Sequence, residues 1–300
     1  MVNPTGDELL VAVGDDGGAA AVGWAAGHAV RAGVGLCLVH VAGHARHMFP
    51  GRSHGTPIRD DAQLVGRQLV EAAAARVDEL TDGAVPVRTE VRTGGVVAVL
   101  SDLGSTCGSV VLSHRPHGAA SVFRDSVALD VAARVDVPVV SVPQGWRSEP
   151  ASDDGGLALR VSVGVADPAG AEPLITRAVE RFRGHDWVLS LLHAWHVSAA
   201  RELGLQPQDF AAEGTERAAR RLSELASAWQ STTPDVDVES RLLHGRAGSV
   251  LQEASQDSDH LVVGRSHRRP HGHVGSVTAA LLRHAACPVE VVPVGTPVSG

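Results

Sequence analysis

Short apolar runs alternate with longer amphipathic stretches along the whole chain. In the first half, the apolar runs predict strands over residues 9–13, 35–41, 85–91, 109–112 and 137–142. The stretches between them predict helices over 19–32, 60–80, 96–103 and 122–134. Because strands and helices alternate, we expect right-handed crossover connections and a parallel sheet.

The second half repeats the first. His40 and His193, each near the end of an apolar run, lie 153 positions apart. The segment Pro138–Pro143 recurs 150 positions later as Pro288–Pro293. Matches in the same order and at a nearly constant shift indicate an internal duplication.

The duplication predicts two domains, over residues 1–143 and 157–300. Between them, residues 144–156 are mostly Arg, Ser, Glu, Pro, Asp and Gly, with Trp146 as the only large apolar residue, which is typical of a linker. We expect each domain to be a doubly wound, Rossmann-like α/β fold, with a five-stranded parallel sheet flanked by helices.

Composition excludes several classes of function. The formal net charge is −8 and no basic run stands out, so nucleic acid and anionic membrane surfaces are not expected partners. No apolar stretch reaches the roughly 18 residues of a membrane span, and the N-terminus lacks the pattern of an export signal. The three cysteines have no CxxC spacing and indicate a reducing compartment, so we expect a cytoplasmic protein. The chain contains no lysine, which excludes a Schiff-base amine and a Walker A loop.

The turns after the first and fourth strands of each domain are the candidate binding positions, because ligands of doubly wound sheets bind where the strand order reverses. In the second domain, the fourth strand ends at Gly264, and a helix begins after Gly275 and Ser276. A glycine lets the backbone approach a ligand closely. The helix start offers N–H groups, a hydroxyl and the positive end of the helix dipole to a phosphate.

This layout resembles the universal stress protein domain, twice, across essentially the whole chain. The segment Arg283–Val292, a helix end followed by Cys-Pro-Val and a strand, also resembles that family. The resemblance implies an adenine nucleotide alpha hydrolase-like fold with the strand order 3-2-1-4-5 in each domain. It further implies that the two domains pair through their last strands as an intramolecular pseudo-dimer, and that the chain can form a homo-oligomer.

Family members that bind ATP carry glycine, two residues, glycine, nine residues, and glycine followed by Ser or Thr. In the first domain, we place Leu112, Arg115 and Asp125 at the three glycine positions, and only Ser126 agrees. The side chain of Leu112 would crowd a nucleotide, and Asp125 would set a negative charge beside its phosphates. We therefore expect no ordinary ATP site in the first domain.

The second domain keeps more of the pattern. Gly264, Gly275 and Ser276 agree with it, whereas His267 replaces the middle glycine. The loop is also short, since Gly264 and Gly275 are 11 positions apart where the pattern has 13. Two arginines inside this loop could meet a polyphosphate directly.

The resemblance implies a stress-response regulatory protein that binds ATP or a related adenine nucleotide in its second domain. The acidic residue expected near the ribose stands one position late in both domains, as Asp15 and Asp167. No general base or metal-ligating acid is evident, so any ATP hydrolysis would be slow. The expected ligand-binding residues are Val165, Asp167, Gly264, His267, Gly275, Ser276 and Val277.

Two other functions remain open. The family also contains members that do not bind ATP, so the chain could be an interaction module that acts through its surface. Sixteen histidines, several of them within residues 40–54 and 267–273, could instead serve a metal site or a hydrolytic enzyme. The chain has no HExxH motif, and its GxSxG match, Gly51–Gly55, does not directly follow a predicted strand as a nucleophile elbow does, so solvent-exposed loop histidines are the simpler interpretation.

Overall fold

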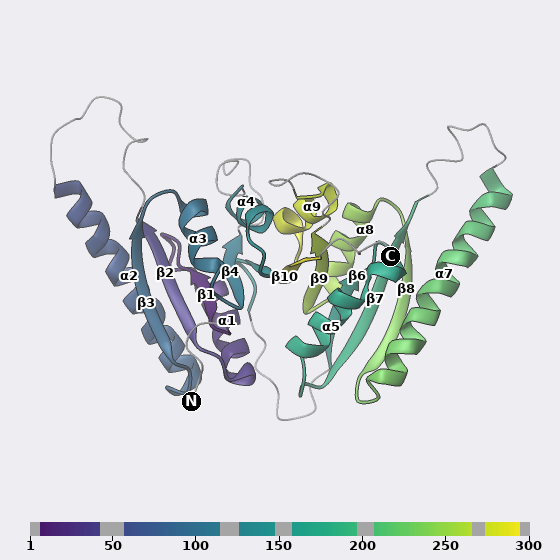
Figure 1. Ribbon diagram of the computed structural model, residues 1–300, viewed down its shortest axis with the longest axis horizontal. Helices are drawn as coiled ribbons and strands as arrows, with labels where there is room; N and C mark the ends of the chain where they lie inside the picture. Colours follow the sequence, from purple (N-terminus) through teal and green to yellow (C-terminus); the bar gives the residue numbers. More distant parts are fainter. Residues whose placement is uncertain are drawn as a thin grey trace. The chain divides into compact units, whose positions relative to one another are not determined.

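A computed structural model describes residues 7–42, 57–114, 126–147, 158–196, 207–265 and 274–294. These residues form two compact units, one from each half of the chain. Each unit contains a parallel sheet with its own helices (Figure 1). We call them the first and the second domain.

The first domain contains five strands and four helices in its described part. Its strands are β1 (Leu9–Ala12), β2 (Leu36–Ala42), β3 (Val87–Thr93), β4 (Ser109–His114) and β5 (Val139–Pro143). Its helices are α1 (Ala19–Ala32), α2 (Pro57–Thr81), α3 (Val96–Gly104) and α4 (Ser126–Arg134).

The second domain repeats this order. Its strands are β6 (Leu159–Gly164), β7 (Trp187–Trp195), β8 (Asp237–His244), β9 (His260–Arg265) and β10 (Val289–Pro293). Its α-helices are α5 (Glu172–Arg181), α7 (Pro207–Thr232), α8 (Ala247–Ala254) and α9 (Ser276–His284). Two short 3-10 helices, η2 (Pro168–Gly170) and η3 (Ser255–Asp257), complete the described elements.

The strand order confirms the doubly wound fold. It is β3-β2-β1-β4-β5 in the first domain and β8-β7-β6-β9-β10 in the second, and the neighbouring strands within each domain are parallel. The order reverses between β1 and β4, and again between β6 and β9. The carboxyl ends of these strand pairs are therefore the expected ligand positions.

Helices cover both faces of each sheet. In the first domain, Leu9 and Val11 of β1 belong to a core shared with α1 and α2. Leu10 points to the other face, where it lies near Gly104 of α3. The alternation follows from the two-residue period of a strand, and burial on both faces explains why β1 is continuously apolar.

The sequence-based bounds agree closely with the observed elements, with shifts at the ends. Helix α2 begins at residue 57 rather than 60, and β4 extends to His114 rather than 112. The predicted helix over 122–134 is observed from Ser126, and residues 122–125 lie outside the described residues. The start of the expected linker packs on the first domain, because Trp146 contacts its core and the N–H of Gln144 donates to the carbonyl of His114 at 2.9 Å.

The second core contains a buried cluster of ionisable groups. Glu290 of β10 is fully buried, and both its carboxylate oxygens meet arginines of α5. Arg181 Nε lies 2.6 Å from Oε2, and Arg177 Nε lies 2.7 Å from Oε1. His260 of β9 donates from Nε2 to Oε2 at 3.2 Å. The carboxylate of Glu290 thus links β10, β9 and α5.

Candidate functional site

A histidine fixes the start of the candidate site in both domains. His40 Nδ1 lies 2.9 Å from the carbonyl oxygen of Val13, and His193 Nδ1 lies 2.8 Å from that of Val165. A carbonyl only accepts, so each Nδ1 carries the proton and donates it. The N–H of Val13 also donates to β2, to the carbonyl of Val39 at 2.8 Å. Val13, which enters the turn after the first strand, is therefore bonded to β2 through both its N–H and its carbonyl.

These paired histidines establish which positions of the two domains correspond. Val13 matches Val165, so Leu9 matches Val161 four residues earlier. Leu9 lies beside Ser109 and Val161 lies beside His260, which makes the starts of β4 and β9 equivalent.

This register corrects the sequence alignment of the fourth strand by one residue. Counting along the strands, Ser113 stands at the position of Gly264, and Leu112 matches Val263. Placing Leu112 at the first glycine position was therefore wrong. Helices α4 and α9 begin at Ser126 and at residue 276, so the first loop is one residue short of the ATP-binding spacing rather than intact. The error arose because an apolar strand gives no internal marker of register.

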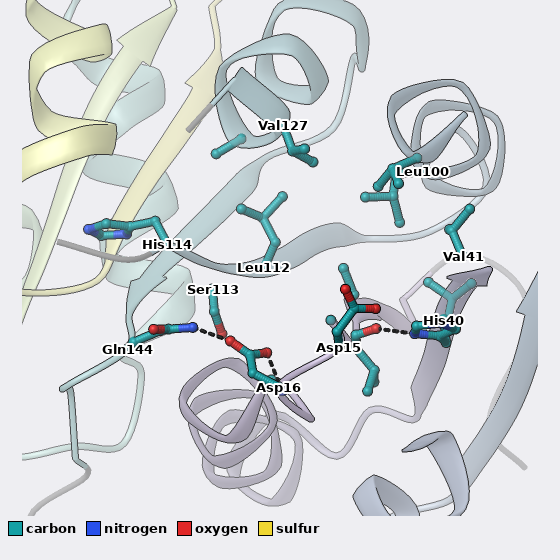
Figure 2. A pocket seen from close by; sticks show the side chains of 17 residues that line it. Asp15, Asp16, His40, Val41, Leu100, Leu112, Ser113, His114, Val127 and Gln144 are labelled. Carbon is teal, nitrogen blue, oxygen red and sulfur yellow. Dashed lines mark hydrogen bonds between the residues drawn. The ribbon is translucent and has the colours of Figure 1, made fainter. Parts of the chain in front are cut away.

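A cavity of about 330 Å³ lies at the carboxyl end of the first sheet. Figure 2 shows Leu100, Leu112 and Val127 on one side of it, with Asp15 and Asp16 on the turn that faces them. All the lining residues belong to the first domain. The cavity thus occupies the strand-order reversal between β1 and β4.

Most polar groups on the cavity wall have partners within the protein. Asp16 accepts from the N–H of Gly18 at 3.1 Å and from the side-chain amide of Gln144. Ser113 Oγ accepts from the N–H of Ala21 at 3.2 Å, which ties β4 to α1. His114 Nδ1 lies 3.0 Å from Ser141 Oγ on β5. These hydrogen bonds hold the side chains of Asp16, Ser113 and His114 in place on the cavity wall.

In the second domain, Val165 and Asp167 lie on the turn after β6, as expected. Val165 is buried, and its carbonyl accepts from His193. Asp167 is exposed and caps η2, since its Oδ1 accepts from the N–H of Ala169 at 3.2 Å. Its carboxylate therefore has a local structural role as well as a position at the strand-order reversal.

Gly264 has a packing reason to be glycine. A Cβ at this position would lie 2.9 Å from Val294 Cγ2 and 3.5 Å from Leu174 Cδ1. The distance to Val294 is shorter than real Cβ contacts allow. Its carbonyl accepts from Thr278 Oγ1 at 3.4 Å, so the end of β9 is also tied to α9. The glycine is explained by this packing whether or not a ligand approaches it.

The start of α9 is open. Gly275 is the N-cap residue, with no side-chain cap among the described residues, and a Cβ there would meet nothing within 4 Å. Ser276 is exposed and Val277 is half-buried. The structure thus places Val165, Asp167 and Gly264 around one strand-order reversal, with Gly275–Val277 on the helix that Thr278 ties to β9. His267 lies outside the described residues.

Matched positions show that the two candidate sites differ in chemistry. The first domain has the more apolar residue at three cavity positions, and His114 at the end of β4 is replaced by Arg265 at the end of β9. The three substitutions, first domain to second, are Val41 to Ala194, Val96 to Ala247 and Ala128 to Thr278. Sequence reasoning overlooked Arg265, although it follows Gly264 directly. Arg265 is buried. Because a guanidinium stays protonated in proteins, it adds a positive charge at the end of β9.

The part of the chain that the structure describes contains no group of three or more His, Cys, Asp or Glu side chains placed to hold a metal ion. His40 and His193 have the backbone contacts given above, and residues 44–54 and 267–273 lie outside the described ranges. Within the described ranges, no helix is long and apolar enough to cross a membrane.

The fold and the turns at its strand-order reversals define a tandem α/β protein of the doubly wound class. The model of the universal stress protein family matches residues 7–143 and 159–293. The chain therefore belongs to the universal stress protein family, with two such domains.

Individual relatives agree with this assignment. Universal stress proteins Rv1996 of Mycobacterium tuberculosis and Mb2019 of Mycobacterium bovis are each 29% identical over 236 residues, which is 75% of this chain and 71% of theirs. A universal stress protein from Archaeoglobus fulgidus has the same fold with a TM-score of 0.66 at 12% identity, covering 95% of this chain and 96% of that one. A putative universal stress protein from Pseudomonas aeruginosa gives a TM-score of 0.54 at 16% identity, covering 95% of this chain and 92% of that one.

Proposed function

We propose that this chain is a regulatory protein of the universal stress protein family that binds ATP or a related adenine nucleotide in its second domain. The observation that carries the proposal is the start of α9, where Gly275 and Ser276 have no side-chain cap among the described residues and the helix is tied to the end of β9. Helix N-termini with unpaired N–H groups favour phosphate. Arg265 adds a positive charge at the end of the same strand, and Asp167 lies across the strand-order reversal for a ribose hydroxyl.

The residues proposed to hold the nucleotide are those expected from the sequence. Val165 and Asp167 would lie at the nucleoside side, and Gly264, His267, Gly275, Ser276 and Val277 at the phosphates. The site is proposed for binding and sensing, because the sequence around it offers no evident general base or metal-ligating acid. Cytoplasmic localisation, pairing of the two domains and assembly of several chains stay predictions from the sequence.

The test is thermal denaturation with and without ATP. A ligand at about ten times its Kd stabilises the folded state by about 1.4 kcal/mol, which raises Tm by roughly 3–6 °C for a domain of this size. Gly275→Asp introduces the residue that the first domain has at this place, and it should abolish the ATP-dependent shift through charge repulsion. Because a carboxylate can also cap α9, the readout is the shift caused by ATP, not Tm itself.

Gly275→Ala is the matched control. Its Cβ enters open space and Gly275 has an ordinary negative φ, so this variant should keep the shift. An unchanged Tm at millimolar ATP for the native chain would refute the nucleotide proposal.

The second candidate is an interaction module without a nucleotide. It is favoured by the packing around Gly264 and the capping role of Asp167, which explain both residues without a ligand. In that case, no adenine nucleotide would change Tm, and protein partners would be retained equally by the native chain and by Gly275→Asp.

A further inference from the structure

We propose that the cavity of the first domain binds an uncharged, largely apolar small molecule, and not a nucleotide. This goes beyond the proposed function, which concerns the second domain. The two proposals fail separately, because they concern different ligands and different residues.

The cavity wall is mainly aliphatic. At about 330 Å³ the cavity lies near the lower end of the range for small-molecule sites. Aliphatic side chains come from β1, β2 and β4 and from the two helices α3 and α4. They include Ala12, Val41, Val96, Leu100, Leu112 and Val127. A ligand that fills this space gains free energy by removing apolar surface from water.

The polar groups of the wall are engaged with the protein. His40 donates to the carbonyl of Val13, Ser113 accepts from the backbone of α1, and Asp16 accepts from Gly18 and Gln144. A polar ligand would have to compete with these contacts, whereas an apolar ligand leaves them intact. The wall therefore favours a molecule that makes few hydrogen bonds.

The charge of the wall disfavours phosphate. Asp15 and Asp16 both lie on the turn that lines the cavity (Figure 2), and the described lining includes no arginine. In the second domain, the matched turn has Asp167 followed by Pro168, and β9 ends in Arg265 instead of His114. One duplicated fold has thus acquired an acidic, apolar site in one copy and a more basic, more polar one in the other.

The experiment compares two fluorescent probes with the same aromatic scaffold on the full chain. N-phenyl-1-naphthylamine is uncharged, and 8-anilinonaphthalene-1-sulfonate adds one sulfonate. We expect saturable binding of the uncharged probe at one equivalent per chain, and binding of the sulfonate probe weaker by about tenfold or more, because its anion meets Asp15 and Asp16. Saturating ATP should not displace the uncharged probe.

Val96→Trp locates the binding. Val96 is 37% exposed at the start of α3, so a larger side chain can be accommodated without disrupting the core, yet it reaches the cavity. This variant should weaken the uncharged probe by about tenfold or more by occupying its volume. Val41→Phe, on β2, is a second variant with the same expected effect. Ala247→Trp makes the matched change in the second domain and should leave binding unchanged.

Three results would overturn the proposal. They are the absence of saturable binding of the uncharged probe, binding of the sulfonate probe at equal or higher affinity, and loss of binding in Ala247→Trp but not in Val96→Trp or Val41→Phe.

Discussion

Replacing the buried carboxylate of Glu290 with an amide should destabilise the second domain selectively. Glu290→Gln keeps the shape of the side chain and removes its charge. Arg181, whose side chain is 1% exposed, would then lie in the core without the carboxylate that both its Nε and Nη2 contact. Removing one partner of a buried ion pair costs about 3–5 kcal/mol, because the remaining charge stays desolvated.

Hydrogen exchange measured by mass spectrometry can assign this loss to a domain. A loss of about 3–5 kcal/mol corresponds to a roughly hundred- to several-thousand-fold increase in the opening of amides in β9 and β10. Amides of β4 and β5 in the first domain provide the internal reference and should not change. Glu239→Gln is the matched control, because Glu239 pairs with Arg160 while both side chains remain over a third exposed, and such pairs contribute about 0–1 kcal/mol. Equal effects of the two variants on β9 and β10 would refute the buried-charge reasoning.

The same cluster predicts how stability depends on pH. Burial raises the pKa of Glu290, but the charges of Arg181 and Arg177 together outweigh burial and hold this pKa well below its ordinary value. Burial lowers the pKa of His260 below its ordinary value of 6.5, although Glu290 opposes the shift. The unfolded chain therefore binds a proton at His260 below about pH 6.5, and at Glu290 below about pH 4.5, where the folded chain does not. Stability of the second domain should fall in two stages as pH decreases, and Glu290→Gln should remove the lower stage.

Three further predictions concern single positions. Gly264→Ala places a methyl group 2.9 Å from Val294 Cγ2, so denaturant unfolding should show a loss of about 1–3 kcal/mol, and a neutral result would contradict the packing explanation. His193→Leu leaves the carbonyl of Val165 without its donor and should cost about 1–3 kcal/mol in the same assay, with a smaller loss for His193→Gln if its amide reaches the carbonyl. Burial raises the pKa of Cys37 to about 11, so its thiol should react with a disulfide reagent only after denaturation; rapid reaction of the native protein would show that β2 opens.

The sequence predicted the elements and their order because both depend on local patterns that the duplication displays twice. Alternation of apolar runs and helical stretches defined ten strands, and the observed strand order in each domain agrees with the order implied by the family resemblance. What the sequence could not define was register within an apolar strand. Leu112 and Ser113 are equally compatible with the end of a buried strand, and only pairing with β1 distinguishes them.

Two features of the interior were overlooked for a different reason. Glu290 interrupts an apolar strand, which is a signal that a partner must lie nearby, but Arg177 and Arg181 are more than 100 positions away. The cavity of the first domain likewise depends on side chains from five elements, and no local pattern records the space left between them. Charged residues inside predicted buried strands are the practical sequence signal for such clusters.

Because the two copies have diverged, we expect the nucleotide to bind in the second domain and not in the first. Hydrogen exchange with and without saturating ATP tests this most directly on the full chain. We expect ATP to slow exchange at the start of α9 and in the turn from Val165 to Gly170, while exchange in the turn after β1 and at the start of α4 does not change. Protection confined to the first domain, or protection in neither domain, would contradict it.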